Sequence, residues 1–372
     1  MKIALVCTNV GYAYRGFERF SLELFHHVKE KLPVTLFGAT SNSRHGGISL
    51  PSIKFDSKFL APFKGKRKDN YFFQQLSYAC SFIPLVVLNS YDIVHFSEPA
   101  MGLFLYHAKR LFKFRYKLLF TDGLGLDPRL NRCFFETRDH TQAITMPHYE
   151  MLLRTGGDSK KVTFLPYGVD SGCYSTKQDK TPLREKYGVP KNKFVILTVA
   201  ALNRRHKRID YVIQEVSQLS RDYFLLVVGQ PEEPDLIDLG HRMLGENFKS
   251  MYVSFDRVAE VYHLADLFVF PCLIGEFGLA LAEAMCAGIP LIADRYFEWM
   301  VQDKRCLADL SKEGNLAHKI EEVISDYGSF QELAKEIQAS AVKRFEWDNL
   351  IPKYLEMYEH VYHLTNGHSR WE

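Results

Sequence analysis

Short apolar runs alternate with amphipathic stretches along most of the chain. In the first half, the apolar runs that predict buried strands lie at residues 3–7, 34–37, 93–96, 117–120 and 142–145. In the second half they lie at residues 194–199, 224–228, 251–253, 267–270 and 291–293. Because short buried strands separated by helices form parallel sheets with helices on both faces, this pattern predicts two doubly wound, Rossmann-like α/β domains.

The pattern changes over residues 168–193, where Gly, Pro, Ser and Lys replace the apolar runs. We therefore expect a hinge there, with an N-terminal domain over residues 1–170 and a C-terminal domain over residues 171–349. Ligands of open parallel sheets bind beyond the carboxyl ends of the strands. We accordingly expect the two domains to face a central cleft.

One turn gathers the polar atoms of an otherwise apolar stretch, residues 270–294. Gly275 and Gly278 follow a buried strand and precede a helix in which Glu283 is the only charged residue. A glycine-containing turn at a helix N-terminus presents free N–H groups to a phosphate or to sugar hydroxyls. The alternative is an ordinary βα unit with Glu276 as a solvated loop charge.

Charge and cysteine content narrow the function classes. The chain of 372 residues has 47 basic and 44 acidic residues, so its net charge of +3 does not suggest nucleic acid as a partner. Its seven cysteines include no Cys-x-x-Cys pair, which argues against a disulfide framework and a zinc knuckle. No apolar run reaches the length of a membrane span or of a signal peptide's apolar core, so we expect a cytoplasmic protein.

Two stretches interleave basic and aromatic residues, and their basic members are Lys109, Arg110, Lys113, Arg115 and Lys117 in one and Lys58, Lys64, Lys66, Arg67 and Lys68 in the other. Such surfaces suit the inner face of an anionic membrane, where each cation contributes about 1 kcal/mol. Two alternatives remain open: an aromatic core face with solvated lysines, and stacking on single-stranded nucleic acid. We favour peripheral membrane contact.

The glycine-containing turn resembles the donor-binding signature of the GT-B glycosyltransferases, in particular retaining family 4, the glycosyl transferases group 1. Phe277, Gly278, Leu279 and Glu283 match that signature. The resemblance implies that the backbone of the turn binds sugar hydroxyls and diphosphate, and that Glu283 holds the donor ribose.

The match fails at one position, because the family's first Glu, which contacts the donor sugar, falls on Gly275 here. Either the loop shifts by one residue so that Glu276 takes this role, or the sugar contact is made differently.

Further matches follow in the family's order along the chain, at residues 16–19, 164–170, 202–210, 227–229 and 345–347. They imply that Gly16 belongs to the donor site and that a last helix, residues 350–372, returns to the N-terminal domain. Residues 202–210 resemble the loop whose cations clamp the donor diphosphate. There Lys207 aligns with the family Lys, and Arg204, Arg205 or Arg208 replaces the family Arg.

The basic loop has a physical reason, since a departing nucleoside diphosphate gains negative charge that fixed cations stabilise. The alternative is a solvated helix start, although cations there oppose the helix dipole. In the N-terminal domain, Asp122 stands where the family often has a His beside the reacting sugar. Asp122 could orient the acceptor or balance oxocarbenium-like charge, or it could simply cap an Asp-Gly turn. His95, at the end of an apolar run, fits a core histidine better than a catalytic one.

We therefore predict a retaining hexosyltransferase that moves a sugar from a nucleotide-sugar donor to a glycan or lipid-linked glycan. Its predicted catalytic residues are Asp122, Glu276 and Lys207, and its predicted donor-binding residues are Gly16, Arg204, Arg205, Lys207, Glu276, Phe277, Gly278, Leu279 and Glu283. No metal or cofactor is expected, because cationic side chains cover the diphosphate and the chain has no Asp-x-Asp motif. The alternatives are a nucleotide-sugar epimerase or phosphorylase of similar fold, and a non-catalytic sugar-nucleotide-binding subunit.

Overall fold

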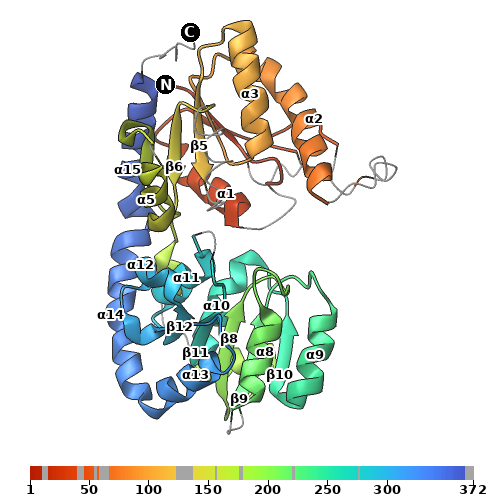
Figure 1. Ribbon diagram of the computed structural model, residues 1–372, viewed down its shortest axis with the longest axis vertical. Coiled ribbons are helices and arrows are strands. Elements are labelled where there is room, and N and C mark those ends of the chain that lie inside the picture. Colours follow the sequence, from red (N-terminus) through yellow and green to blue (C-terminus); the bar gives the residue numbers. More distant parts are fainter. Residues whose placement is uncertain are drawn as a thin grey trace. The chain divides into compact units, whose positions relative to one another are not determined.

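A computed structural model describes residues 1–10, 16–39, 46–53, 57, 67–122, 137–155, 157–175, 179–219, 223–274 and 277–364. The chain divides into two compact units (Figure 1). Unit 1 comprises Met1–Gly168 and the C-terminal segment from Asp348, and unit 2 comprises Val169–Trp347. Both crossing points lie two residues before the predicted ones.

Unit 1 is a parallel sheet in the order β3-β2-β1-β4-β5-β6-β7 with helices packed on it. Its strands are β1 (Ile3–Val6), β2 (Val34–Gly38), β3 (Ile48–Ser49), β4 (Ile93–Phe96), β5 (Lys117–Asp122), β6 (His140–Ala143) and β7 (Val162–Phe164). Its helices are α1 (Gly16–Val28), α2 (Arg67–Leu88), α3 (Pro99–Phe112), α5 (Met146–Arg154) and α15 (Trp347–His363), which begins one residue before the crossing. Helices α2 and α3 lie side by side (Figure 1).

Unit 2 is a second parallel sheet, in the order β10-β9-β8-β11-β12-β13. Its strands are β8 (Phe194–Val199), β9 (Tyr223–Val228), β10 (Phe248–Met251), β11 (Leu267–Phe270), β12 (Leu291–Asp294) and β13 (Leu307–Ala308). Its α-helices are α6 (Ser171–Ser175), α7 (Lys180–Tyr187), α8 (Ile209–Ser217), α9 (Asp235–Leu244), α10 (Val258–Leu264), α11 (Leu279–Ala287), α12 (Glu298–Val301), α13 (Asn315–Ser325) and α14 (Tyr327–Phe345). The two doubly wound sheets confirm the predicted fold class, while the cleft between them stays a prediction.

Local sequence explains where several helices begin and end. The Asp179 carboxylate accepts from the Thr181 N–H at the start of α7, and Gly188 ends that helix in the left-handed conformation. Helix α11 lies between Gly278 and Gly288, both with positive φ, as the glycine positions predicted.

Two predicted strands are displaced along the chain. The strand predicted at residues 251–253 ends at Met251 instead, because Phe248 packs against α9 and pairs with Leu225 of β9. The strand predicted at 142–145 begins at His140, whose Nε2 lies 2.8 Å from the Thr163 hydroxyl on β7. Pairing with β7 thus brings polar residues into the sheet.

Buried polar side chains tie helix α15 to the sheet of unit 1. His95 on β4 is fully buried, with Nδ1 2.8 Å from the Tyr358 hydroxyl and Nε2 2.6 Å from the Thr121 hydroxyl. The Thr121 hydroxyl donates to Gln142 Oε1, and Gln142 Nε2 donates to the Tyr354 hydroxyl. His95 therefore donates from Nε2 and accepts from Tyr358 at Nδ1, and burial lowers its pKa to about 3. This confirms His95 as a core residue.

Candidate active site

The strand order of unit 2 reverses between β8 and β11, so that the loops after these two strands lie at one edge of the sheet. Residues 200–208 follow β8, and the glycine-containing turn follows β11. The Arg208 guanidinium joins them by donating to the carbonyls of Pro271 (3.1 Å) and Leu310 (2.8 Å). In open parallel sheets, this reversal point is where ligands bind.

Asn203 shapes the basic loop. Its Oδ1 accepts from the N–H groups of His206 (3.0 Å) and Lys207 (2.9 Å), and its Nδ2 donates to Glu232 (2.9 Å). Lys207 is half-buried, and its ammonium group forms no ion pair or hydrogen bond with any residue that the structure describes. An anion site requires a fixed backbone and an ammonium group that is not already paired with a carboxylate.

The arginines of this loop differ in the partners that their guanidinium groups contact. Arg204 pairs with Glu233 (2.6 Å) and Asp235 (2.5 Å), and hydrogen bonds to these two carboxylates raise its pKa. Arg208 lies 4.0 Å over the Tyr211 ring and is held by the two carbonyls described above. Arg205 is exposed and has no partner within the described part of the chain. Among the predicted donor-binding cations, Lys207 and Arg205 are therefore available to a ligand, whereas Arg204 is engaged.

Gly278 begins α11 with a φ of +73°, and a Cβ at this position would lie 3.2 Å from the Phe270 ring. The N–H groups of Leu279 and Ala280 in the first turn donate to no described residue. They lie at the positive end of the helix dipole. Gly275 and Glu276 lie outside the described residues, so the proposed shift of this loop stays a prediction.

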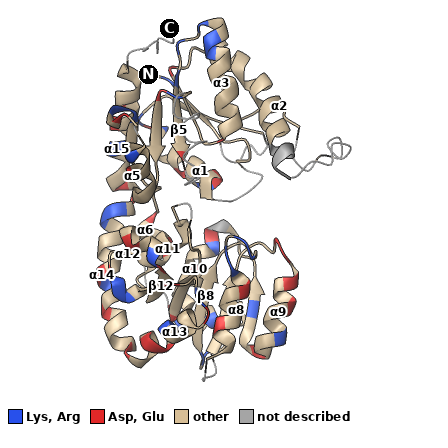
Figure 2. Ribbon diagram, in the orientation of Figure 1, with Lys and Arg blue, Asp and Glu red and all other residues tan. Residues whose placement is uncertain are grey.

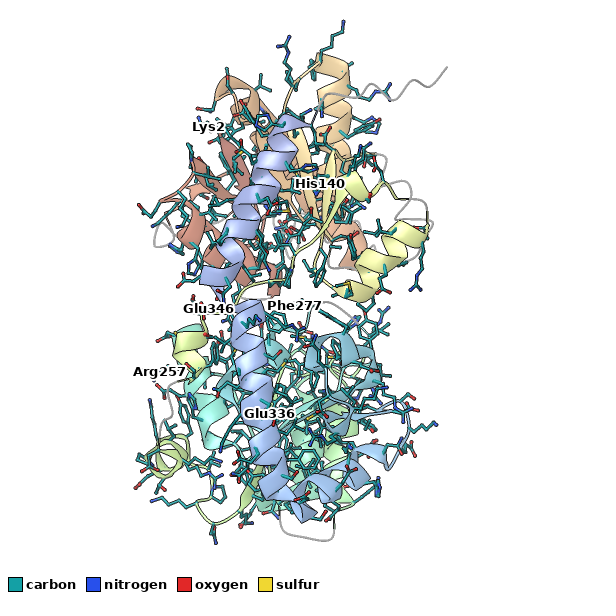
Figure 3. All side chains as sticks on the ribbon, turned by 90° about the vertical axis from the view of Figure 1, so that its left-hand side faces the viewer. Lys2, His140, Arg257, Phe277, Glu336 and Glu346 are labelled. Atoms are coloured by element: carbon teal, nitrogen blue, oxygen red, sulfur yellow. The ribbon has the colours of Figure 1, made fainter. Side chains whose placement is uncertain are left out.

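Phe277 is placed in the core rather than at the edge of the sheet. Its ring is fully buried, with its centroid 5.3 Å from that of Phe345 and 6.3 Å from that of Trp299 (Figure 3). The side chain therefore anchors the turn, and only the backbone of Phe277 is suited to contact a donor.

Glu283 lies one turn into α11 and is 2% exposed. The Tyr262 hydroxyl of α10 donates to its Oε2 over 2.6 Å. This bond fixes the orientation of the carboxylate and leaves it with hydrogen-bond acceptor capacity. Sequence reasoning found Glu283 but not Tyr262, whose only signal is its place in an amphipathic helix.

Gly229 allows β9 to approach the loop after β8. A Cβ at this position would lie 1.9 Å from the Ala200 carbonyl oxygen, so any side chain would displace the loop. The Leu202 N–H donates to the Gln230 carbonyl (2.9 Å) beside it. This close approach sets the height of the basic loop above the sheet.

In unit 1, Asp122 ends β5 and is buried beside an arginine and a histidine. Its Oδ2 lies 3.5 Å from the Arg138 guanidinium and 3.4 Å from His148 Nε2. Arg138 lies 4.3 Å over the Phe120 ring, and burial lowers its pKa to about 10. Burial likewise lowers the pKa of His148, although the Asp122 charge opposes this. The Arg138 guanidinium thus compensates the Asp122 charge, and sequence reasoning missed both Arg138 and His148.

Gly16, the remaining predicted donor residue, begins α1 and is half-buried, with open space where a Cβ would stand. Because it belongs to unit 1, its placement beside the loops of unit 2 stays a prediction. The two units thus hold the predicted residues in two separate groups.

Comparison with known proteins shows which family the chain resembles. Residues 179–344 match the family described as glycosyl transferases group 1. The chain is 24% identical over 284 residues to N-acetyl-alpha-D-glucosaminyl L-malate synthase of Bacillus anthracis, covering 72% of this chain and 74% of that protein. The C-terminal part of the chain thus matches the group 1 glycosyltransferases, and the relative in Bacillus anthracis extends the similarity to most of the chain.

Solved structures place this glycosyltransferase in the GT-B fold. Sucrose-phosphate synthase from Thermosynechococcus elongatus superposes with a TM-score of 0.81 at 18% identity, over 97% of this chain and 99% of that one. Anabaena HepE in complex with UDP and glucose superposes with a TM-score of 0.78 at 17% identity, over 96% and 99% of the two chains.

The family match includes the basic loop, the glycine-containing turn and Glu283, whereas Asp122 lies outside it. Together with the relatives that are named as glycosyltransferases, this match supports transferase activity for the chain.

Proposed function

We propose that this protein is a retaining glycosyltransferase that moves a hexosyl group from a nucleotide-sugar donor to a hydroxyl of a glycan or lipid-linked glycan. One observation carries the proposal: the Lys207 ammonium and the N–H groups that begin α11 follow the two strands where the sheet of unit 2 reverses, and none of them has a partner among the described residues. Both features favour a diphosphate.

In the proposed reaction, the bond between the sugar's anomeric carbon and the diphosphate oxygen breaks, and the acceptor oxygen bonds to that carbon. The departing diphosphate takes the electron pair and then the acceptor's proton, so that no further reactant is needed. Lys207 and the N-terminus of α11 stabilise the growing negative charge. Attack from the leaving-group side retains the anomeric configuration.

Glu283 would bind the ribose in this scheme. A carboxylate accepts hydrogen bonds from two neighbouring hydroxyls, and the Tyr262 hydroxyl holds it in a single orientation. Asp122 would orient the acceptor in unit 1, with its charge balanced by Arg138 and with His148 beside it. No protein ligand set for a metal ion enters the scheme.

Peripheral membrane contact is proposed for the C-terminal end of α3. Leu111 and Phe112 are 76% and 60% exposed, and Arg110, Lys113 and Arg115 are exposed as well. Figure 2 shows basic residues at one end of α3. The other side chains of this stretch support the core-face alternative instead, because Lys109 pairs with Asp139, and Lys117 and Tyr116 are buried. The second basic stretch lies outside the described residues as far as Lys66, and no described helix is both long and apolar enough to cross a membrane.

The proposed function is tested by incubating the full chain with UDP-glucose, UDP-galactose, UDP-N-acetylglucosamine or GDP-mannose and a panel of alkyl glycosides. Transfer with the donor's anomeric configuration in the product, determined by NMR, is the expected result. Inversion would refute the retaining mechanism. A nucleotide sugar isomerised without acceptor would identify an epimerase, and binding without turnover would identify a non-catalytic subunit.

A further inference from the structure

A pocket of about 350 Å³ lies on the flank of unit 1, between β7, the short 3₁₀-helix η3 (Ser159–Lys161) that precedes it, and α15. This volume is near the lower limit for a small-molecule site. Because β7 is the last strand in the sheet order, β5 and β6 separate the pocket from the reversal of that order between β1 and β4. The pocket is therefore distinct from the place where an open parallel sheet is expected to bind its substrate.

Two histidines connect the walls of this pocket. His140 begins β6 and is buried, and its Nε2 lies 2.8 Å from the Thr163 hydroxyl on β7. The centroid of its ring lies 5.2 Å from that of His360 on α15 (Figure 3). His360 Nε2 in turn donates to the Lys160 carbonyl of η3 over 2.8 Å. The sheet, η3 and α15 are thus held together around the pocket.

The charged side chains that line the pocket are Lys160, Lys353 and Glu356. All three are exposed, and their charged groups form no ion pair or hydrogen bond within the described ranges. Burial, followed by the charge of His360, lowers the pKa of His140 to about 4, so the His140 ring is neutral at neutral pH. Two ammonium groups against one carboxylate leave the pocket with a net positive charge. The pocket therefore favours an anionic group.

The uncharged lining narrows the occupant further. Ser159 and Thr163 contribute hydroxyls, and the buried Leu165 and Met357 contribute apolar atoms. Ammonium and hydroxyl groups donate hydrogen bonds, so the phosphate oxygens are suitable acceptors for them. The apolar atoms suit a short carbon chain, and Glu356 accepts a hydrogen bond from a hydroxyl on that chain. Inorganic phosphate would leave both of these features without a partner.

We propose that this pocket binds a small phosphate monoester with a hydroxyl group on its carbon chain, and that Lys160 and Lys353 bind its phosphate. The inference goes beyond the proposed function and is independent of it, because no residue of the pocket is among those predicted for catalysis or donor binding. The ester is either free in solution or the headgroup of a lipid, and the test separates these two sources.

The test is NMR titration of the full chain with sn-glycerol 3-phosphate, followed through the ring resonances of His140 and His360. Both rings should shift as the ester binds, whereas glycerol should leave them unchanged. Lys160→Gln and Lys353→Gln should each weaken binding by about threefold or more, because each removes a cation from the phosphate. Lys161→Gln removes a neighbouring exposed cation that does not line the pocket. It is the matched control and should change the affinity less than about twofold.

Two further comparisons test the carbon chain and its source. Wild type should prefer sn-glycerol 3-phosphate to inorganic phosphate. Glu356→Ala should reduce this preference by about threefold or more, since the hydroxyl loses its acceptor and the phosphate loses a repelling charge, whereas Glu359→Ala should preserve it. Tighter binding of 1-hexanoyl-lysophosphatidic acid than of sn-glycerol 3-phosphate would support the proposal with a lipid headgroup as the source. Weaker binding of the lipid would support it with a free ester.

The inference is wrong if sn-glycerol 3-phosphate shifts neither histidine ring, or if the Lys160 and Lys353 variants bind it as the Lys161 control does. The substituted side chains are exposed, so the variants should fold, which circular dichroism checks. Lys207→Ala should show the same ring shifts as the wild type, because Lys207 belongs to unit 2. Loss of the shifts in Lys207→Ala would assign the phosphate to the donor loops and would also overturn the inference.

Discussion

At the residue scale, Glu283 shows how a single buried carboxylate is prepared for binding. Tyr262 donates to one of its oxygens, and the surrounding helix α11 is otherwise apolar. We expect Glu283→Ala to weaken nucleoside diphosphate binding by about 1–3 kcal/mol, the range for hydrogen bonds to a charged group. Calorimetric titration measures this.

A variant of Tyr262 separates the role of its hydroxyl from the role of the Glu283 carboxylate in nucleotide binding. Tyr262→Phe keeps the Glu283 carboxylate and removes the hydroxyl that contacts it and the Ala280 carbonyl, so it should weaken nucleotide binding less than Glu283→Ala does. A folded Glu283→Ala protein with wild-type nucleotide affinity would show that the carboxylate only fills the core.

Glu98 should make folding less favourable at high pH. Its pKa rises from 4.5 to about 7 on folding, so the folded state disfavours the charged form. Wild-type stability is therefore fully present below pH 4.5 and is lost as pH rises through 7, by at most about 3 kcal/mol. We expect Glu98→Gln to be more stable than wild type at pH 8 and similar to it near pH 4.5.

Thermal melts across this pH range measure the difference. A constant gap between variant and wild type would mean that Glu98 has an ordinary pKa in the folded protein.

At the scale of elements, the end of α3 exposes two neighbouring large apolar side chains, Leu111 and Phe112. We expect Leu111→Ser/Phe112→Ser to reduce cosedimentation with phosphatidylglycerol vesicles, because the side chains that enter the headgroup region are lost. Added salt should reduce wild-type binding by screening the adjacent cations.

The control for this experiment is Met243→Ser, which changes a 41% exposed apolar residue on α9 of unit 2. It should bind vesicles as the wild type does. Membrane contact would be refuted if the α3 variant bound vesicles as well as the wild type does. It would also be refuted if the wild type bound pure phosphatidylcholine as well as anionic vesicles.

Sequence predicted the elements of this fold better than it predicted the pairings of the site. Strands such as β8 and β11 were found because they are continuous apolar runs, whereas β3 and β13, with two residues each, carry too little signal. The availability of Lys207 and the engagement of Arg204 depend on carboxylates about thirty residues away at the start of α9. No local pattern reports such a pairing.

At the scale of the whole molecule, the return of the chain into unit 1 depends on α15. The hydroxyl of Tyr358 donates to the buried His95, so Tyr358→Phe leaves a ring nitrogen unsatisfied. We expect a loss of about 1–3 kcal/mol in the stability of unit 1. Tyr362→Phe, on the same helix and 40% exposed, is the control and should melt as the wild type does.

A Tyr358→Phe protein with an unchanged melting temperature would show that another group or water replaces the hydroxyl. Nucleotide affinity should be unaltered in either case, since the donor loops belong to unit 2.

The central claim is that the loops after β8 and β11 hold the diphosphate of a nucleotide sugar. The most direct measurement is calorimetric titration of UDP, GDP and ADP, each beside its nucleoside, into wild type, Lys207→Ala and the control Lys335→Ala. The diphosphate that binds should lose about tenfold or more in affinity in Lys207→Ala, while its nucleoside and the control change little. Equal losses for diphosphate and nucleoside, or no loss for either, would contradict the account.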